Sequence, residues 1–210
     1  MKSIKNIAKA LTGFAFIVTL CSQPVKAGEW TTVKGAVSTK NPHALVTVES
    51  DAEISSRLSV FGFIDAEATE EKPYDFKSLY CEGRVTLKFN NLVRAIAEYN
   101  GGNNYEDTIR LGIAVTPKLG KDNFTFIKLF PYETTEKKGP QASLFTLQNL
   151  TDRLSASILA DYNLDSKTLY LEPTLDYKLG NNLSAFIQGR SFGKVGEFDF
   201  VPYVGISKSF

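Results

Sequence analysis

The sequence predicts an all-β protein: a closed, antiparallel, up-and-down β-barrel that spans a membrane. Three observations predict it: long runs in which apolar and polar residues alternate, a turn pattern that returns about every 30 residues, and an export signal at the amino terminus. Twelve strands are favoured. Ten are the alternative, because residues 29–37, 44–51 and 143–150 alternate least clearly.

The first 27 residues have the features of a secretory signal peptide. Three lysines precede a mostly apolar stretch, residues 10–21, which is too short to cross a bilayer as a helix. Val25 and Ala27 place small residues where a signal peptidase cleaves. We therefore expect cleavage after Ala27 and a single barrel domain over residues 28–210.

The composition of the predicted mature chain argues against several classes of function. Acidic residues outnumber basic ones once the lysines of the signal are removed, whereas a nucleic-acid-binding protein would carry a basic stripe. Only Cys81 remains, so no disulfide can form within the chain. The single histidine, His43, provides no zinc site. We expect no cofactor and no metal.

Four runs alternate regularly, and one of them is SLYCEGRVTLKF, residues 78–89. Its apolar face carries Leu79, Cys81, Gly83, Val85, Leu87 and Phe89. Residues 108–116, 168–179 and 183–192 repeat the pattern. Globular strands usually have about five or six residues. These longer runs suit tilted strands that cross a bilayer.

Short turns rich in Asn, Gly and Asp open the expected strands, as in KFNNLVRA, KLGKDNFTF, NLTDRLSAS and KLGNNLSAF. Extending their spacing towards the amino terminus gives six hairpins, whose first strands begin near Trp30, Arg57, Leu92, Asn123, Leu154 and Leu183. The connections at the other ends, such as NGGNNYED and YETTEKKGPQ, are longer and more charged. This difference predicts turns and both termini on the periplasmic side. Closure would pair residues 30–38 with residues 198–209.

The chain ends on YVGISKSF. Together with the signal peptide and the amphipathic strands, this ending resembles bacterial outer-membrane β-barrel proteins, and the length and short loops are similar to the small twelve-stranded porins of the oligogalacturonate type. The resemblance implies an assembly signal for the barrel-assembly machinery, formed by Tyr203, Gly205, Ile206 and Phe210, from which Lys208 departs. It also implies the outer membrane of a Gram-negative bacterium, with its lipid and lipopolysaccharide, as the location. The oligomeric state stays open.

If the apolar faces meet lipid, the polar faces line the lumen. The predicted lumen then carries the basic residues Arg84, Lys88, Arg94, Arg110 and Arg190 and the acidic residues Glu82, Glu98, Asp161, Glu172 and Asp176. Four of the basic residues lie on three successive strands, so we expect a basic wall that faces an acidic wall. Such walls set ion selectivity in channels.

This pattern predicts a narrow, charge-selective channel for passive diffusion of small solutes, with anions favoured by the basic wall. The alternative is a closed structural or interaction barrel whose outer loops contact a partner or lipopolysaccharide. We expect no enzyme. The alternative to that expectation is a lipid hydrolase that uses His43 beside Ser38 and Asn41.

Five aromatic residues near strand ends on the apolar face are expected to form girdles at the membrane interfaces: Trp30, Phe89, Tyr99, Tyr162 and Tyr177. Glu70 and Glu71 are expected to form a charged rim. Together with Asp65, Glu67 and Asp75 they are a candidate site for divalent cations that bridge lipopolysaccharide, although no calcium-loop spacing is present.

Overall fold

The computed structural model describes residues 29–40, 43–69, 76–103, 105–117, 119–120, 123–134, 139–197 and 199–210. The predicted signal peptide and its cleavage after Ala27 lie outside the described residues. The same holds for Asn41 of the catalytic alternative.

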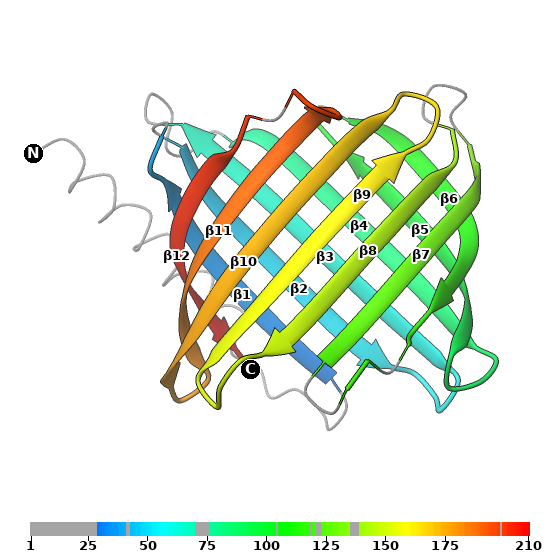
Figure 1. The fold of residues 1–210 in the computed structure, drawn as a ribbon, viewed down its shortest axis with the longest axis horizontal. Helices are drawn as coiled ribbons and strands as arrows, with labels where there is room; N and C mark the ends of the chain where they lie inside the picture. Colours follow the sequence, from blue (N-terminus) through cyan, green and yellow to red (C-terminus); the bar gives the residue numbers. More distant parts are fainter. Residues whose placement is uncertain are drawn as a thin grey trace, which may run out of the picture.

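Twelve antiparallel strands form one closed barrel, in which inclined strands wrap around a common axis (Figure 1). They are β1 (Glu29–Ser38), β2 (His43–Glu53), β3 (Leu58–Thr69), β4 (Phe76–Lys88), β5 (Val93–Gly102), β6 (Tyr105–Val115), β7 (Asn123–Glu133), β8 (Gln141–Asn149), β9 (Leu154–Asn163), β10 (Thr168–Gly180), β11 (Leu183–Lys194) and β12 (Val201–Ser209). The favoured count of twelve is confirmed. In the described part of the chain no helix is long and apolar enough to cross a membrane.

The first and last strands close the barrel, as predicted. β12 pairs antiparallel with β1, with Thr32 opposite Ser209, and Phe210 N donates a hydrogen bond to Thr31 O at 2.9 Å. Every strand therefore has two hydrogen-bonded neighbours. Glu29 and Phe210 lie at the same rim, which we call the terminus end. The opposite rim is the loop end.

Alternation along the strands places apolar side chains outside and polar side chains inside. Ile187 is 57% exposed, whereas its neighbour Gln188 is 4% exposed. The same contrast occurs in β6, where Ile109 and Leu111 are exposed and Arg110 is buried. A water-soluble barrel would reverse the two faces, because water would then contact its exterior. The apolar exterior is the surface that a membrane barrel presents to lipid.

The hairpins begin where the turn pattern placed them. β5, β7, β9 and β11 start at or next to the predicted residues. Asn181 and Asn182, between β10 and β11, have φ angles of 50° and 58°, which is the backbone of a tight hairpin turn that Asn tolerates. The expected difference in loop length is smaller than predicted. Most of NGGNNYED continues β5 and β6, because strand pairing extends to Gly102 and Tyr105.

Candidate functional site in the barrel interior

Glu98 on β5 is the centre of a buried charge cluster. Its side chain is 1% exposed, and its Oε2 accepts a hydrogen bond from Lys128 Nζ on β7 at 2.6 Å. Its Oε1 accepts from Asn100 Nδ2 at 3.2 Å and lies 3.5 Å from Arg110 Nη1 on β6. Arg110 Nε also donates to Glu133 Oε2 at 2.9 Å. The Glu98 carboxylate is thus paired on both oxygens, the condition under which a buried charge is tolerated.

Arg84 and Glu82 extend this cluster onto β4. Glu82 Oε1 lies 3.8 Å from Arg84 Nη1 and 3.8 Å from Lys128 Nζ. The guanidinium carbon of Arg84 lies 4.3 Å from the ring centre of Phe61 and 5.1 Å from that of Phe126. Such cation–π contacts offset part of the cost of holding a guanidinium away from water. We call the following six residues the central cluster: Glu82, Arg84, Glu98, Arg110, Lys128 and Glu133.

The structure does not separate a basic wall from an acidic wall. Arg84 lies beside Glu82, and Arg110 lies between Glu98 and Glu133. The physical reason is that charges held away from bulk water lower their free energy by pairing with the opposite sign. The alternating pattern places these side chains inside the barrel, but it does not show which of them meet.

Arg190 on β11 forms a second cluster with residues of β3 and β10. Its Nη1 lies 2.8 Å from Asp65 Oδ2, and its Nε lies 3.0 Å from Glu172 Oε2. Its guanidinium carbon is 5.9 Å from the ring centre of Tyr203, and Tyr170 OH donates a hydrogen bond to Glu172. Three strands, β12, β1 and β2, lie between β11 and β3 around the barrel. The contact between Arg190 and Asp65 therefore crosses the interior.

Four of the predicted lumen charges, among the described residues, have no oppositely charged partner within 4.0 Å: Lys88, Arg94, Asp161 and Asp176. Asp161 Oδ1 and Arg94 Nε are buried atoms without a hydrogen-bond partner in the protein. Buried polar atoms of this kind are normally satisfied by water. These two positions indicate a hydrated interior beside β9 and at the terminus end.

Apolar side chains occupy other parts of the interior. Phe130 is 1% exposed and lies in a buried group of four on β5, β6 and β7: Ile96, Ala114, Phe126 and Phe130. A second group joins β1, β2, β11 and β12: Ala36, Leu45, Phe186 and Tyr203. The interior is therefore narrowed by aromatic rings on two sides.

Among the predicted girdle residues, Trp30 is a correction. It shares the interior face of β1 with Thr32 and Lys34, because side chains alternate along a strand. Its ring centre lies 6.4 Å from that of Phe61, which contacts Arg84 inside the barrel. The weak alternation of the first strand explains the wrong face. The other four are at the surface, three of them exposed and Tyr162 partly exposed: Phe89, Tyr99, Tyr162 and Tyr177.

No family model matches the sequence, and no curated protein matches it. Solved structures match its fold. The KdgM porin has 12% sequence identity, a TM-score of 0.59, and coverage of 86% of this chain and 99% of that chain. The NanC porin has 7% sequence identity and a TM-score of 0.56, with coverage of 85% of this chain and 98% of that chain. The chain has the porin-like fold of outer-membrane β-barrels.

Not every structure with this fold is a porin. The outer-membrane phospholipase of Salmonella typhi, solved as a dimer with bound calcium, has 9% identity and a TM-score of 0.60, with 90% of this chain and 93% of that chain covered. At such identities the similarity concerns the fold alone.

In this porin-like barrel, the last strand needs Gly205 for packing. Gly205 lies opposite Phe186 on β11 and Ala36 on β1. A Cβ at this position would lie 2.6 Å from Phe186 Cζ and 2.3 Å from Gly35 O. Tyr203 shares the interior face and is 5% exposed. Gly205 therefore has a structural role in the folded barrel, besides any role in an assembly signal.

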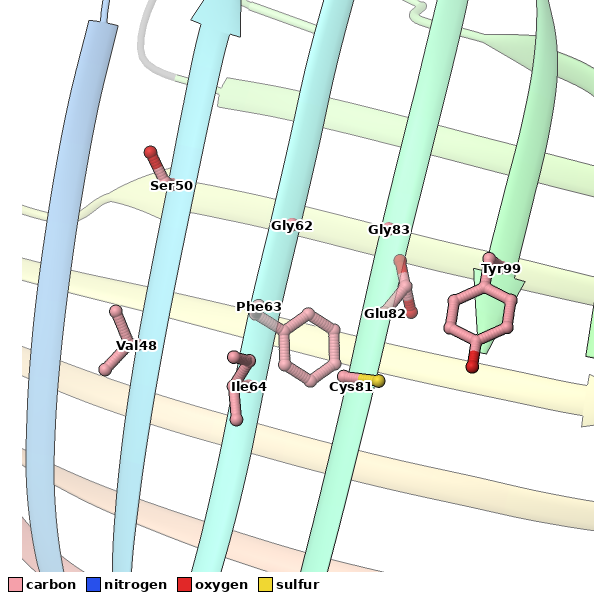
Figure 2. Close-up of a pocket in the computed structure, with 9 residues that line it drawn as sticks. All are labelled: Val48, Ser50, Gly62, Phe63, Ile64, Cys81, Glu82, Gly83 and Tyr99. Carbon is pink, nitrogen blue, oxygen red and sulfur yellow. The ribbon is translucent and has the colours of Figure 1, made fainter. Parts of the chain in front are cut away.

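A groove of about 420 Å³ lies on the exterior of the porin-like barrel, across β2 to β5 (Figure 2). Gly62 and Gly83 are opposite each other on β3 and β4, and their missing side chains leave the hollow. The Tyr99 hydroxyl at its edge already donates a hydrogen bond to Asp107 Oδ1 at 2.9 Å. The groove belongs to the apolar surface of the barrel and offers little to orient a polar solute.

Of the candidate catalytic residues, Ser38 ends β1 and His43 begins β2, next to the ladder pair of Val37 and Ala44. His43 Nδ1 lies 2.7 Å from Glu67 Oε1 at the loop end of the interior. Residues 189–193, GRSFG, have the GxSxG spacing of serine hydrolases. However, Ser191 lies within β11, 2% exposed, whereas that motif requires a strand-to-helix turn. No group of three His, Cys, Asp or Glu in the described residues is placed to hold a metal.

The sequence pattern missed several charged residues that the structure places in the interior, among them Lys34, Glu49, Asp65, Glu67, Lys128 and Glu133. Lys34 Nζ and Glu49 Oε1 are 3.0 Å apart. Glu70, Glu71 and Asp75 of the expected acidic group lie outside the described residues. Its other two members, Asp65 and Glu67, belong to β3 and pair inside the barrel with Arg190 and His43. Lys128 lies in the nearly continuous apolar run NFTFIKLFPYE, which hides the alternation. A single lysine within such an apolar strand could have indicated that its side chain points into the barrel.

Proposed function

We propose that the chain is a narrow outer-membrane channel for the passive diffusion of small polar solutes. The observation that carries the proposal is the interior of the closed barrel, which holds unpaired charges and buried polar atoms of Arg94 and Asp161 without a protein partner. Charged groups enclosed by a barrel require water unless they are paired. The folds of the KdgM and NanC porins support the same assignment.

The charges without a partner decide the proposed selectivity. Among the residues that the structure describes, no carboxylate lies within 4.0 Å of Lys88 or Arg94, whereas the positive charges of the central cluster are offset by their partners. Asp161 and Asp176 also lack an ion-pair partner in the described part of the chain, and their negative charges favour cations in the lumen. We therefore propose a weak preference for small anions that arises at the terminus end. KdgM has also been solved in complex with disordered oligogalacturonate.

The two ends of the barrel support a proposal for its orientation and assembly. We propose that the terminus end faces the periplasm and that the apolar exterior contacts outer-membrane lipid and lipopolysaccharide. The last strand would be read by the barrel-assembly machinery through Tyr203, Gly205, Ile206 and Phe210. The position of Phe210 at the rim that also carries Glu29 supports this orientation.

The test is single-channel conductance of the refolded protein in a planar bilayer, with ion selectivity taken from the reversal potential in a salt gradient. We expect discrete steps with a weak anion preference. Arg94→Gln should lower this preference and Asp161→Asn should raise it. Lys208→Gln is the matched control, because its Nζ donates to Asn181 O at the rim and its side chain lies on the exterior face. Electrical silence from folded, inserted protein would refute the channel.

A closed structural barrel is the second candidate. The contact between Arg190 and Asp65 crosses the interior, and Glu98 and Phe130 are each 1% exposed. If these side chains fill the lumen, no solute passes through it, and the connections at the loop end are left as the functional surface. The conductance experiment separates the two candidates, because a filled barrel stays silent while remaining folded.

A further inference from the structure

Three cationic residues come together at the terminus-end mouth. Lys88 is the last residue of β4 and lies directly opposite Arg94 of β5 in the strand register. Arg57, in the β2–β3 turn, accepts a hydrogen bond at its backbone oxygen from Lys88 N at 2.7 Å. All three line one polar cavity of about 50 Å³, which Glu53 and Thr86 also line. We call this cavity the mouth pocket.

The mouth pocket carries three cations against one lining carboxylate, Glu53, and Asp51 on β2 is the further acid whose charge acts on Arg94. Like charges directly opposite each other in a β-ladder are destabilising. Among the described residues, no carboxylate oxygen lies within 4.0 Å of Arg57, Lys88 or Arg94, and Glu53 is the one carboxylate that lines the pocket. Arg94 Nε is also buried without a hydrogen-bond partner. The arginines of the central cluster, by contrast, all contact carboxylates.

We propose that the mouth pocket binds an oxyanion, namely phosphate or the phosphate group of a larger molecule. Arginine presents a planar set of N–H donors that matches oxyanions, and lysine adds a point charge. The Thr86 hydroxyl supplies a further donor in the lining. A water needs roughly 10–15 Å³ of such volume, so the pocket has room for a group larger than one water. Binding at this mouth goes beyond the proposed channel, because it does not require a continuous passage.

The opposite side of the barrel provides a matched control. Lys178 N donates to Arg153 O at 2.8 Å, which repeats the backbone bond between Lys88 and Arg57 at the same end. Across the β10–β11 pair, however, Lys178 faces Ser184 rather than a second cation. Loss of Lys178 therefore removes the same charge without touching the mouth pocket.

The experiment measures binding of inorganic phosphate to the refolded, full-length mature protein in micelles of an uncharged maltoside detergent at low salt. Isothermal titration calorimetry should give saturable binding of one phosphate. Charge-assisted hydrogen bonds are worth roughly 1.5–3 kcal/mol, so Arg94→Gln and Lys88→Gln should each weaken the affinity about tenfold or more. Lys178→Gln should leave it unchanged. An equal loss in Lys178→Gln, or the absence of saturable binding, would overturn the proposal.

Thermal unfolding separates loss of the site from loss of folding. Without phosphate, Lys88→Gln should be at least as stable as the wild type, because it removes a like-charge pair. With phosphate, the wild type should gain more stability than the variant at the same phosphate concentration. A Lys88→Gln variant that is less stable than the wild type without phosphate would contradict the proposal, since Lys88 would then have a stabilising partner.

The phosphate group can come from solution or from a lipid headgroup at the rim. Nanodiscs of phosphatidylcholine and of phosphatidylglycerol distinguish the two sources. Equal phosphate affinity in both supports a ligand from solution. Weaker affinity in phosphatidylglycerol supports the same pocket with the anionic headgroup as a competing ligand.

Discussion

Lys128 on β7 reaches past β6 to Glu98 on β5, and their Nζ and Oε2 atoms are 2.6 Å apart in the barrel interior. Both side chains are nearly inaccessible, at 7% and 1% exposed. The contact joins strands that share no ladder hydrogen bonds. The ion pair therefore links β5 to β7 through the interior, in addition to the backbone pairing that closes the barrel.

Removing the cation of this pair should destabilise the folded barrel. Lys128→Met keeps the length of the side chain but leaves Glu98 with Arg110 and Asn100 as its remaining partners. Breaking a buried ion pair on one side costs about 3 kcal/mol or more. The loss is measured by denaturant unfolding in micelles, followed by the fluorescence of Trp30, the single tryptophan. The double variant Lys128→Met, Glu98→Gln should recover part of this lost stability. If the single variant Lys128→Met is as stable as the wild type, water already solvates Glu98.

Arg190→Ala should widen the lumen. The change removes the side chain that bridges β11 to Asp65 on β3 and Glu172 on β10. We expect a larger single-channel conductance together with lower stability, because two carboxylates lose their cation. Lys208→Ala, on the exterior face, is the control and should conduct like the wild type. An unchanged conductance in Arg190→Ala would place the passage away from this contact.

Gly205→Ala should destabilise the barrel, and Gly83→Ala should not. A Cβ at Gly205 would lie 2.6 Å from Phe186 Cζ, whereas one at Gly83 meets no atom within 4 Å. Overpacking of this kind costs about 1–3 kcal/mol, while an unobstructed strand position changes stability by about 0.5 kcal/mol or less. Unfolding midpoints of the two refolded variants give the comparison. Equal midpoints would show that the Phe186 ring moves aside freely.

Phe210→Ala should reduce assembly in cells far more than it reduces the stability of refolded protein. The proposed role of Phe210 is recognition by the assembly machinery, and its backbone hydrogen bond to Thr31 O does not depend on the side chain. The amount of folded barrel in the outer-membrane fraction measures assembly. Leu179→Ala, which changes an exposed apolar residue at the same end, is the control. Similar losses in both variants would assign Phe210 a general packing role.

The periodic strands were the part of this protein that sequence predicted well. Alternation in SLYCEGRVTLKF put Glu82 and Arg84 on one face, and that face lies inside the barrel. Prediction failed where alternation was weak or interrupted. Trp30 was placed outside because β1 mixes small, polar and apolar residues on both faces, and Lys128 was missed because phenylalanines surround it. A strand pattern gives the direction of a side chain only when its two faces differ in polarity.

The sequence by itself determined the hairpin order, the pairing of the first strand with the last, and which face of most strands is charged, and it favoured twelve strands over ten. These features depend on local alternation and turn residues, which act over a few neighbouring positions. Only the tertiary structure decided that the apolar face is the outer one, that Lys128 meets Glu98, and that Arg190 crosses the lumen to Asp65. Arg190 and Asp65 are 125 residues apart, and no local pattern encodes which of several enclosed charges will pair once the barrel closes.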